Sequence, residues 1–149
     1  MEHVFSYTAS LRAPPEVIGP VPEGVRLNFY VTGGEVSGPR LRGQVRPVGA
    51  DWFTLRADGM GVLAVRATIE THEGVLIDVA YEGLGDLGAD GYAQFLAGRM
   101  PERLNLTTTP RLRCAHPDYG WLHRTHCVGI GQVNLQTFTV AYDVYALRQ

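Results

Sequence analysis

The sequence has 149 residues, a length that predicts one domain with a core large enough to fold without a disulfide or a metal. Hydrophobic residues make up 45% and charged residues 19%, a balance that excludes a disordered chain. The formal net charge of −2 gives no reason to expect nucleic acid or an anionic membrane as a partner. All thirteen basic residues are arginines, so the chain lacks the lysine of Schiff-base enzymes and P-loop phosphate sites.

The first twelve residues alternate between apolar and polar types, unlike the continuous apolar stretch of a signal peptide. No apolar run is long enough to cross a membrane as a helix. We therefore expect a soluble cytoplasmic protein that binds neither membrane nor nucleic acid. Cys114 and Cys127 are too few for the disulfide framework of a secreted scaffold, and we expect both to be free thiols.

Strict alternation of apolar and polar residues predicts several strands in the first half of the chain. We expect them at residues 5–11, 25–32 and 52–57. Each is followed by residues that favour turns or cannot donate to a sheet, namely Pro14-Pro15, Gly33-Gly34 and Asp58-Gly59.

The strongest local prediction is a hairpin formed by residues 62–72 and 75–81, joined at Glu73-Gly74. One face of its first strand is apolar and the other is polar. The apolar face carries Leu63, Val65, Ala67 and Ile69, and the polar face carries Arg66, Thr68, Glu70 and His72.

Residues 89–99 form the one good helix candidate, which Pro101 ends. Further strands are expected at residues 104–114, 121–130 and 136–147. About nine strands with one short helix, and no alternation of strands with helices, predict an all-β antiparallel fold. A closed barrel is favoured over a sandwich because closure leaves no exposed strand edge.

Several short segments occur in a distinctive order and spacing. They are GEVSGPRLRG at 34–43, GADW at 49–52, RADG at 56–59, RAT at 66–68, EG at 73–74, PDYGWLHRT at 117–125, Gly129, and VAYDVY at 140–145. Together they resemble the DUF3237 family, also called UPF0311. The resemblance implies a single antiparallel β-barrel domain over residues 1–149, of uncharacterised function, with a small organic ligand as its expected partner. The family often has Asn where this chain has His123, so a pocket there implies a different ligand or chemistry.

Asp51, Trp52 and Arg66 form the first set of candidate binding residues. If residues 52–57 and 62–72 pair around the Asp58-Gly59 turn, Arg66 lies near Asp51 or Trp52. An arginine can bind a carboxylate through two parallel hydrogen bonds, and such a pair could anchor an anionic or carbonyl ligand. The alternative is a surface ion pair. If the apolar face of this strand turns into the barrel, Arg66 on the opposite face lies in solvent unless the strand bends at a bulge.

Cysteines and histidines gather late in the chain, at Cys114, His116, His123, His126 and Cys127. Zinc accepts such ligands, but His123 and His126 are an odd number of residues apart and would point to opposite faces of a strand. The closely spaced pairs typical of zinc sites are also missing. We expect no metal site and no cofactor.

Aromatic residues supply the last candidates, since they line small-molecule pockets as well as barrel cores. Tyr119, Trp121 and His123 stand where a loop enters a strand, the usual position of a barrel mouth. Trp52, Tyr81, Tyr142 and Tyr145 fit a core equally well. We therefore expect any pocket to be lined by Asp51, Trp52, Arg66, Tyr119, Trp121 and His123. Of these, His123 and Tyr119 would transfer protons.

Three functions remain open at this point. The barrel could be a cofactor-independent isomerase, cyclase or lyase that acts by acid–base chemistry on a small molecule. It could instead hold a small ligand without turnover, as lipocalin-type barrels do. A third alternative is a structural protein whose barrel is filled by side chains, and homo-oligomerisation is also left open.

Overall fold

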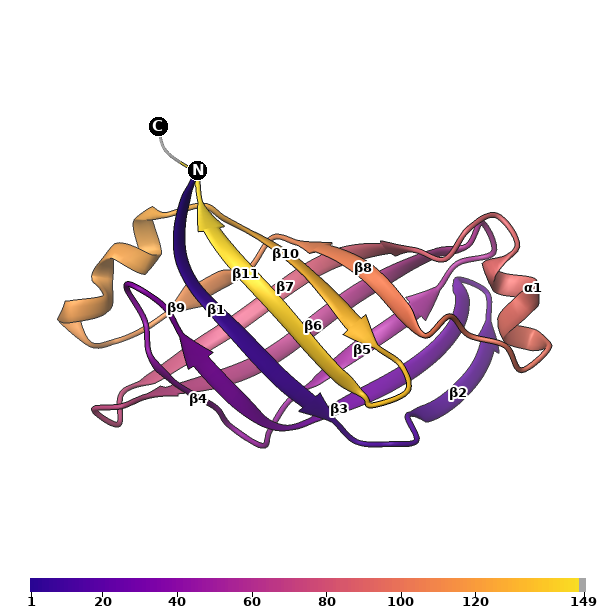
Figure 1. The fold of residues 1–149 in the computed structure, drawn as a ribbon, viewed down its shortest axis with the longest axis horizontal. Helices are drawn as coiled ribbons and strands as arrows, with labels where there is room; N and C mark the ends of the chain where they lie inside the picture. The colour runs from indigo at the N-terminus through magenta and orange to yellow at the C-terminus, as the bar shows by residue number, and fades with distance from the viewer. Residues whose placement is uncertain (148–149) are drawn as a thin grey trace.

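A computed structural model describes residues 1–147, in which an antiparallel sheet of eleven strands closes on itself. Eight strands form the barrel, in the order β3, β1, β11, β10, β8, β7, β6 and β5, with β5 pairing back to β3 (Figure 1). Their bounds are β1 Glu2–Leu11, β3 Gly24–Ser37, β5 Ala50–Leu55, β6 Met60–Thr71, β7 Leu76–Asp86, β8 Arg103–Thr108, β10 Cys127–Asn134 and β11 Thr139–Ala146. The all-β antiparallel barrel expected from the sequence is confirmed.

Three short strands extend the wall of the barrel. β2 (Glu16–Val21) pairs with β3, β4 (Gly43–Val45) bridges β3 and β6, and β9 (Arg111–Arg113) pairs with β7. The described chain therefore has more strands than the nine expected. One reason is Pro110, which divides the expected strand at 104–114 because proline has no N–H to donate.

The hairpin predicted at 62–72 and 75–81 is confirmed as β6 and β7, whose pairing runs from Met60 with Asp86 to Glu70 with Leu76. The face of β6 predicted to be apolar turns inward in the structure. The opposite face, which carries Arg66, turns outward. The alternation in the sequence therefore identified both faces of this hairpin.

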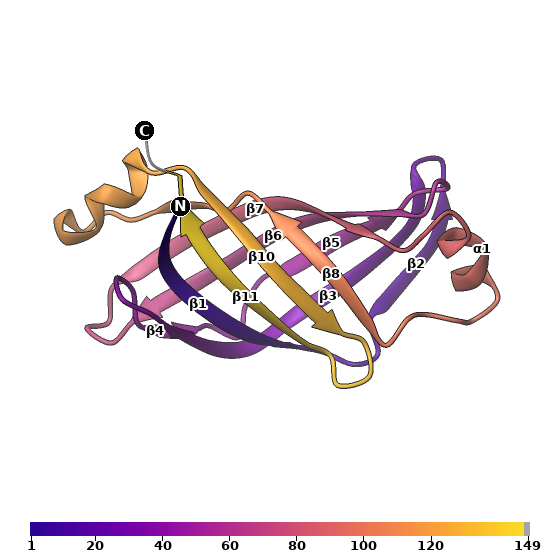
Figure 2. The same cartoon turned by 45° about the horizontal axis from the view of Figure 1, so that its top comes forward.

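Two short helices lie at opposite ends of the barrel, and the views in Figures 1 and 2 agree on this. α1 (Gly91–Leu96) falls inside the helix expected at 89–99. The 3₁₀ helix η1 (Pro117–Arg124), drawn in orange, replaces the first part of the strand expected at 121–130, which was wrong there. Pro117 is well suited to begin a helix, and β10 starts only at Cys127. Within residues 1–147, no helix is long and apolar enough to cross a membrane.

The core is divided into two clusters of buried apolar side chains. The η1-end cluster packs against Tyr119 and Trp121, and includes Val4, Phe5, Val31, Val45, Ile69, Ile77, Val79, Leu112, Leu122 and Val144. The α1-end cluster packs against Tyr92 and Phe95, and includes Val25, Leu27, Phe29, Phe53, Leu55, Leu63, Val65, Leu104, Leu106, Val133 and Val140. Tyr7 and Tyr81 contact both clusters and therefore mark the middle of the barrel.

Candidate functional site

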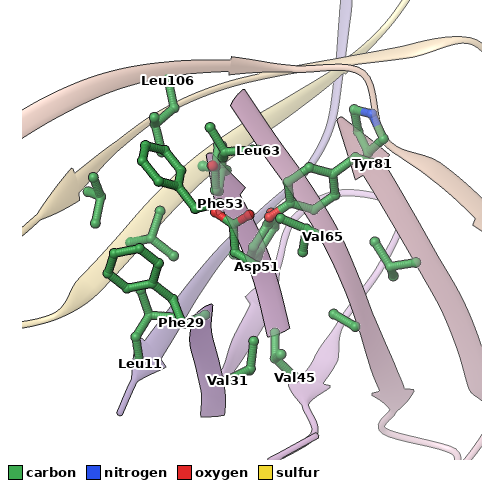
Figure 3. Close-up of a pocket in the computed structure, with 18 of the residues that line it drawn as sticks. Leu11, Phe29, Val31, Val45, Asp51, Phe53, Leu63, Val65, Tyr81 and Leu106 are labelled. Atoms are coloured by element: carbon green, nitrogen blue, oxygen red, sulfur yellow. The ribbon is translucent and has the colours of Figure 1, made fainter. Parts of the chain in front are cut away.

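A cavity lies inside the barrel between the two clusters (Figure 3). Its volume is about 80 Å³. Its wall is almost entirely hydrocarbon. Within the described chain, the polar lining side chains are Tyr7, Asp51, Tyr81 and Tyr142.

Asp51 reaches the cavity because β5 alternates across the barrel wall. Asp51 and Phe53 line the cavity, while Trp52 between them is 41% exposed on the outside. The backbone N–H of Ala64 donates a hydrogen bond to the Asp51 carboxyl at 3.0 Å. Burial raises the pKa of Asp51 to about 7, against the opposing effects of the Ala64 N–H and the positive charge of Arg26. This carboxyl can therefore gain or lose a proton near neutral pH.

Three tyrosines bring hydroxyl groups into the same space. The Tyr7 hydroxyl donates a hydrogen bond to the Tyr81 hydroxyl at 2.7 Å, although 74 residues separate them in the chain. The Tyr7 and Tyr142 rings stack with centroids 5.1 Å apart, and the Tyr81 ring meets Tyr142 edge-on at 5.9 Å. Burial raises the pKa of all three well above 10, and the nearby Asp51 raises each further. The three hydroxyls therefore remain neutral at the pH where Asp51 titrates.

Two glycines of β10 make room for side chains of the neighbouring strands. Gly131 pairs with Tyr142 across β10 and β11. A Cβ atom on Gly131 would collide with the Tyr142 ring, and one on Gly129 would collide with the buried hydroxyl of Thr108. The absence of a side chain at Gly131 therefore leaves room for the Tyr142 ring, and its absence at Gly129 leaves room for the Thr108 hydroxyl.

The geometry supports proton transfer to and from a small apolar molecule. A carboxyl with a pKa near neutrality is suited to act as both acid and base at that pH. Neutral tyrosine hydroxyls can donate hydrogen bonds to an oxygen on which negative charge develops. The surrounding hydrocarbon excludes competing water and strengthens both interactions.

Of the predicted binding residues on β5 and β6, the structure places Asp51 in the cavity and the other two outside it. Trp52 packs edge-on against Tyr30 on the outer surface, with ring centroids 5.8 Å apart. Arg66 is opposite Ala50 and faces outward, 3.7 Å from the carboxylate of Asp78. Arg66 is therefore on the opposite side of the wall from Asp51, because neighbouring positions of β5 point to opposite sides, and it makes the surface ion pair that the sequence left open as the alternative. Ligand binding by Trp52 and Arg66 stays a prediction.

Tyr119, Trp121 and His123 lie together on η1, outside the cavity lining. The Tyr119 hydroxyl donates to Glu73 at 2.7 Å, and the Arg40 guanidinium lies over the Trp121 ring at 3.7 Å. His123 Nε2 accepts a hydrogen bond from the backbone N–H of Cys114 at 3.0 Å. These contacts hold η1 against the end of the barrel. Roles for the three residues in ligand binding or catalysis stay predictions.

The sulfur atoms of Cys114 and Cys127 are buried free thiols in the structure. Burial raises the pKa of Cys127, so that its thiol ionises to the reactive thiolate less readily. Among residues 1–147 no group of three or more His, Cys, Asp or Glu side chains is arranged to hold a metal ion.

The sequence alone assigns Tyr81 and Tyr142 to a core or a pocket and gives Tyr7 no role in a site. The signal for Tyr7 was its position among Phe5, Ala9 and Leu11 on the apolar face of β1. A hydroxyl on a face that is otherwise hydrocarbon needs a buried partner. The identity of that partner, Tyr81, depends on how the barrel closes.

Comparison with known proteins gives one family across the described chain. The profile described as "Protein of unknown function (DUF3237)" matches residues 1–147. A UPF0311 protein of Rhodopseudomonas palustris is 30% identical over 130 residues, which cover 86% of this chain and 84% of the relative.

Solved structures share the barrel over nearly its full length. A beta-barrel like protein of Acinetobacter baumannii has a TM-score of 0.82 at 29% identity, covering 99% of this chain and 94% of that one. A protein with unknown function from Clostridium acetobutylicum has a TM-score of 0.87 at 25% identity, covering 99% and 97%. An enzyme from Penicillium herquei has a TM-score of 0.64 at 20% identity, covering 97% and 92%, a likeness that shows the fold alone.

Proposed function

This chain belongs to the DUF3237 family of UPF0311 proteins, and we propose that its barrel binds a small organic molecule and moves a proton on it. The observation that carries the proposal is Asp51, a carboxyl with a pKa of about 7 on the wall of a largely hydrocarbon cavity. A carboxyl in such surroundings destabilises the folded protein when it ionises, so its position needs a reason other than stability.

The proposed chemistry is that of a cofactor-independent isomerase, cyclase or lyase. In an isomerisation, the Asp51 carboxylate takes a proton from a carbon next to a carbonyl, and the C–H electron pair moves to form the enolate. The Tyr81 hydroxyl donates a hydrogen bond to the enolate oxygen. In a substrate whose enolate is conjugated with a further carbon–carbon double bond, the Asp51 carboxylic acid then returns the proton to the carbon at the far end of that system. The double bond moves into conjugation with the carbonyl, the substrate has lost and regained one proton, and the Asp51 carboxylate is regenerated.

The alternative is a binding protein that holds the same ligand without turnover. The apolar lining favours ligand retention whether or not a proton moves, because most of the binding free energy of a small apolar ligand comes from burying its surface. Asp51 and Tyr81 would then only orient the ligand.

Solvent-deuterium exchange separates the two alternatives. The probe is dibutyl ketone, whose carbons beside the carbonyl exchange hydrogen for deuterium only when a base removes a proton. We expect wild-type protein in heavy water to accelerate exchange at least tenfold over the Asp51→Asn variant, with a rate that rises as the pH passes about 7. Asp78→Asn, which changes an exposed carboxylate on the outer wall, is the matched control.

Exchange that is equal in wild-type and Asp51→Asn protein, while the ketone still binds, would contradict the catalytic proposal and leave the binding protein. Native mass spectrometry of freshly purified protein would then identify the retained molecule. If the ketone does not bind and no molecule co-purifies with the protein, both alternatives are contradicted.

A further inference from the structure

The polar groups of the cavity lie in one layer across the middle of the barrel. On one wall, Val65 pairs with both Asp51 and Tyr81, so these two stand in the same inward-facing row of β5, β6 and β7. On the other wall, Tyr7 pairs with Tyr142 across β1 and β11. The hydrogen bond between the Tyr7 and Tyr81 hydroxyls joins the two walls. Figure 3 shows Asp51 and Tyr81 pointing toward one another.

Hydrocarbon extends from this layer in both directions. Towards η1 the cavity is lined by members of the η1-end cluster, namely Phe5, Val31, Val45, Ile69 and Val79. Towards α1 it is lined by members of the α1-end cluster, namely Phe29, Phe53, Leu63, Leu104, Leu106, Val133 and Val140. A ligand that reaches the polar layer can therefore bury apolar surface on both sides of it.

The lining side chains of the described chain include no Arg, Lys or His. Arg26, the cation whose charge acts on Asp51, donates its hydrogen bonds to the backbone oxygen of Phe53 and the side-chain oxygen of Asn28. A carboxylate or phosphate in the cavity would be buried without a counter-charge and close to Asp51. Both effects oppose the binding of an anion.

From this layer and its two flanks, we propose that the ligand is an uncharged molecule with its oxygen-containing group at mid-length, between two hydrocarbon arms. The oxygen lies at Asp51 and Tyr81, and one arm extends towards each end of the barrel. This inference rests on the proposed function and specifies its substrate class. It excludes fatty-acid-like ligands, whose charged group stands at one end.

Binding of four matched probes tests the proposal. Dibutyl ketone has a central carbonyl, methyl heptyl ketone has the same atoms with the carbonyl near one end, nonanoate has a terminal charge, and dibutylamine has a central cation. We expect calorimetry at about pH 8, where nonanoate is ionised, to give dibutyl ketone at least tenfold tighter binding than nonanoate and about threefold tighter than methyl heptyl ketone. Infrared spectra should show the carbonyl stretch of bound dibutyl ketone at lower frequency in wild-type than in Tyr81→Phe protein.

Tighter binding of nonanoate than of dibutyl ketone would overturn the exclusion of anions. Equal binding of the two ketones with no infrared shift would overturn the placement of the ligand's oxygen at mid-length. Tighter binding of dibutylamine than of dibutyl ketone would overturn the uncharged ligand and indicate a cation instead. Each of these results leaves ligand binding itself intact. Failure of all four probes to bind wild-type protein would overturn this inference together with the proposed function. Asp78→Asn again serves as the control, since its substitution lies outside the cavity.

Discussion

Asp51 and Tyr81 face one another across a single intervening residue of the sheet, Val65, which pairs with both. Two strand spacings separate their backbones, about 10 Å, a gap that a tyrosine side chain can largely span. Their relative position is therefore set by the hydrogen-bonded register of β5, β6 and β7 rather than by a loop. Sites built on strands hold their geometry more closely than sites built on loops.

Asp51→Asn should stabilise the protein at alkaline pH. The folded-state pKa of about 7 lies above the ordinary value of 3.8, so the contribution of Asp51 to stability is full below about pH 4 and is lost as pH rises through 7. Asn cannot ionise but keeps an oxygen for the Ala64 N–H. We expect a gain of up to about 4 kcal/mol in the free energy of unfolding at about pH 8, and little gain at about pH 4.

Thermal unfolding across this pH range measures the effect. Asp78→Asn, which removes an exposed carboxylate paired with Arg113 at 2.8 Å, is the control and should show no comparable gain at alkaline pH. A gain for Asp51→Asn that is independent of pH would contradict the assignment of a raised pKa to Asp51.

Tyr7→Phe and Tyr81→Phe should each cost about 1–2 kcal/mol of stability, because each leaves the other hydroxyl without its partner among hydrocarbon. The double variant should cost less than the sum of the two, by at least about 0.5 kcal/mol, since the bond between the two hydroxyls can be lost only once. Denaturant unfolding of the four proteins gives this coupling. Tyr30→Phe combined with Tyr81→Phe should be additive, because the Tyr30 hydroxyl donates to Glu16 on the outer surface. Additivity for Tyr7 and Tyr81 as well would refute their direct bond.

Gly131→Ala should destabilise the barrel by about 1–3 kcal/mol, since the new methyl group would strike the Tyr142 ring and the Ala141 backbone. Gly120→Ala is the matched comparison, because a Cβ atom there meets nothing within 4 Å. It should stay within about 0.5 kcal/mol of wild type. If Gly131→Ala is as stable as Gly120→Ala, the Tyr142 ring is not held where the structure places it.

His123→Ala should lower stability by about 1 kcal/mol through loss of the hydrogen bond from the Cys114 N–H, and leave dibutyl ketone binding within about twofold of wild type. His126→Ala, at an exposed position immediately before β10 begins, controls for loss of an imidazole. Loss of deuterium exchange in His123→Ala with an unchanged melting temperature would instead support the proton-transfer role predicted from the sequence.

The fold could be predicted from the sequence where alternation was strict and a turn residue was unambiguous. β6 and β7 meet both conditions, and Gly74, with φ of 85°, adopts the backbone conformation that favours glycine. In η1 the same kind of pattern was misleading. Tyr119, Trp121 and His123 have the spacing of one strand face, but Pro117 starts a helical turn instead.

The site was harder to predict because its members are brought together by barrel closure. An aspartate at the start of a strand, such as Asp51, is the residue type expected in a turn or at a surface position. Its inward direction becomes clear in the sheet, where it pairs with Val65 and shares the inner face of β5 with Phe53. The sequence separation of Tyr7 and Tyr81 hides their contact in the same way, since neither lies on a neighbouring strand of the other.

The pairing of β1 with β11 has a consequence for how the protein is made. One edge of β1 pairs with β3, but on its other edge residues 2–10 pair with residues 139–146, so the ribosome must add Thr139–Ala146 before the wall between β1 and β11 can form. Until then, the inner surfaces of β1, β3, β5, β6 and β7 remain open to water, and Tyr7 has no Tyr142 to stack on. Asp51 in that open sheet is a solvated carboxylate with an ordinary acidity. Its distinctive chemistry therefore arises only when the last strand closes the barrel.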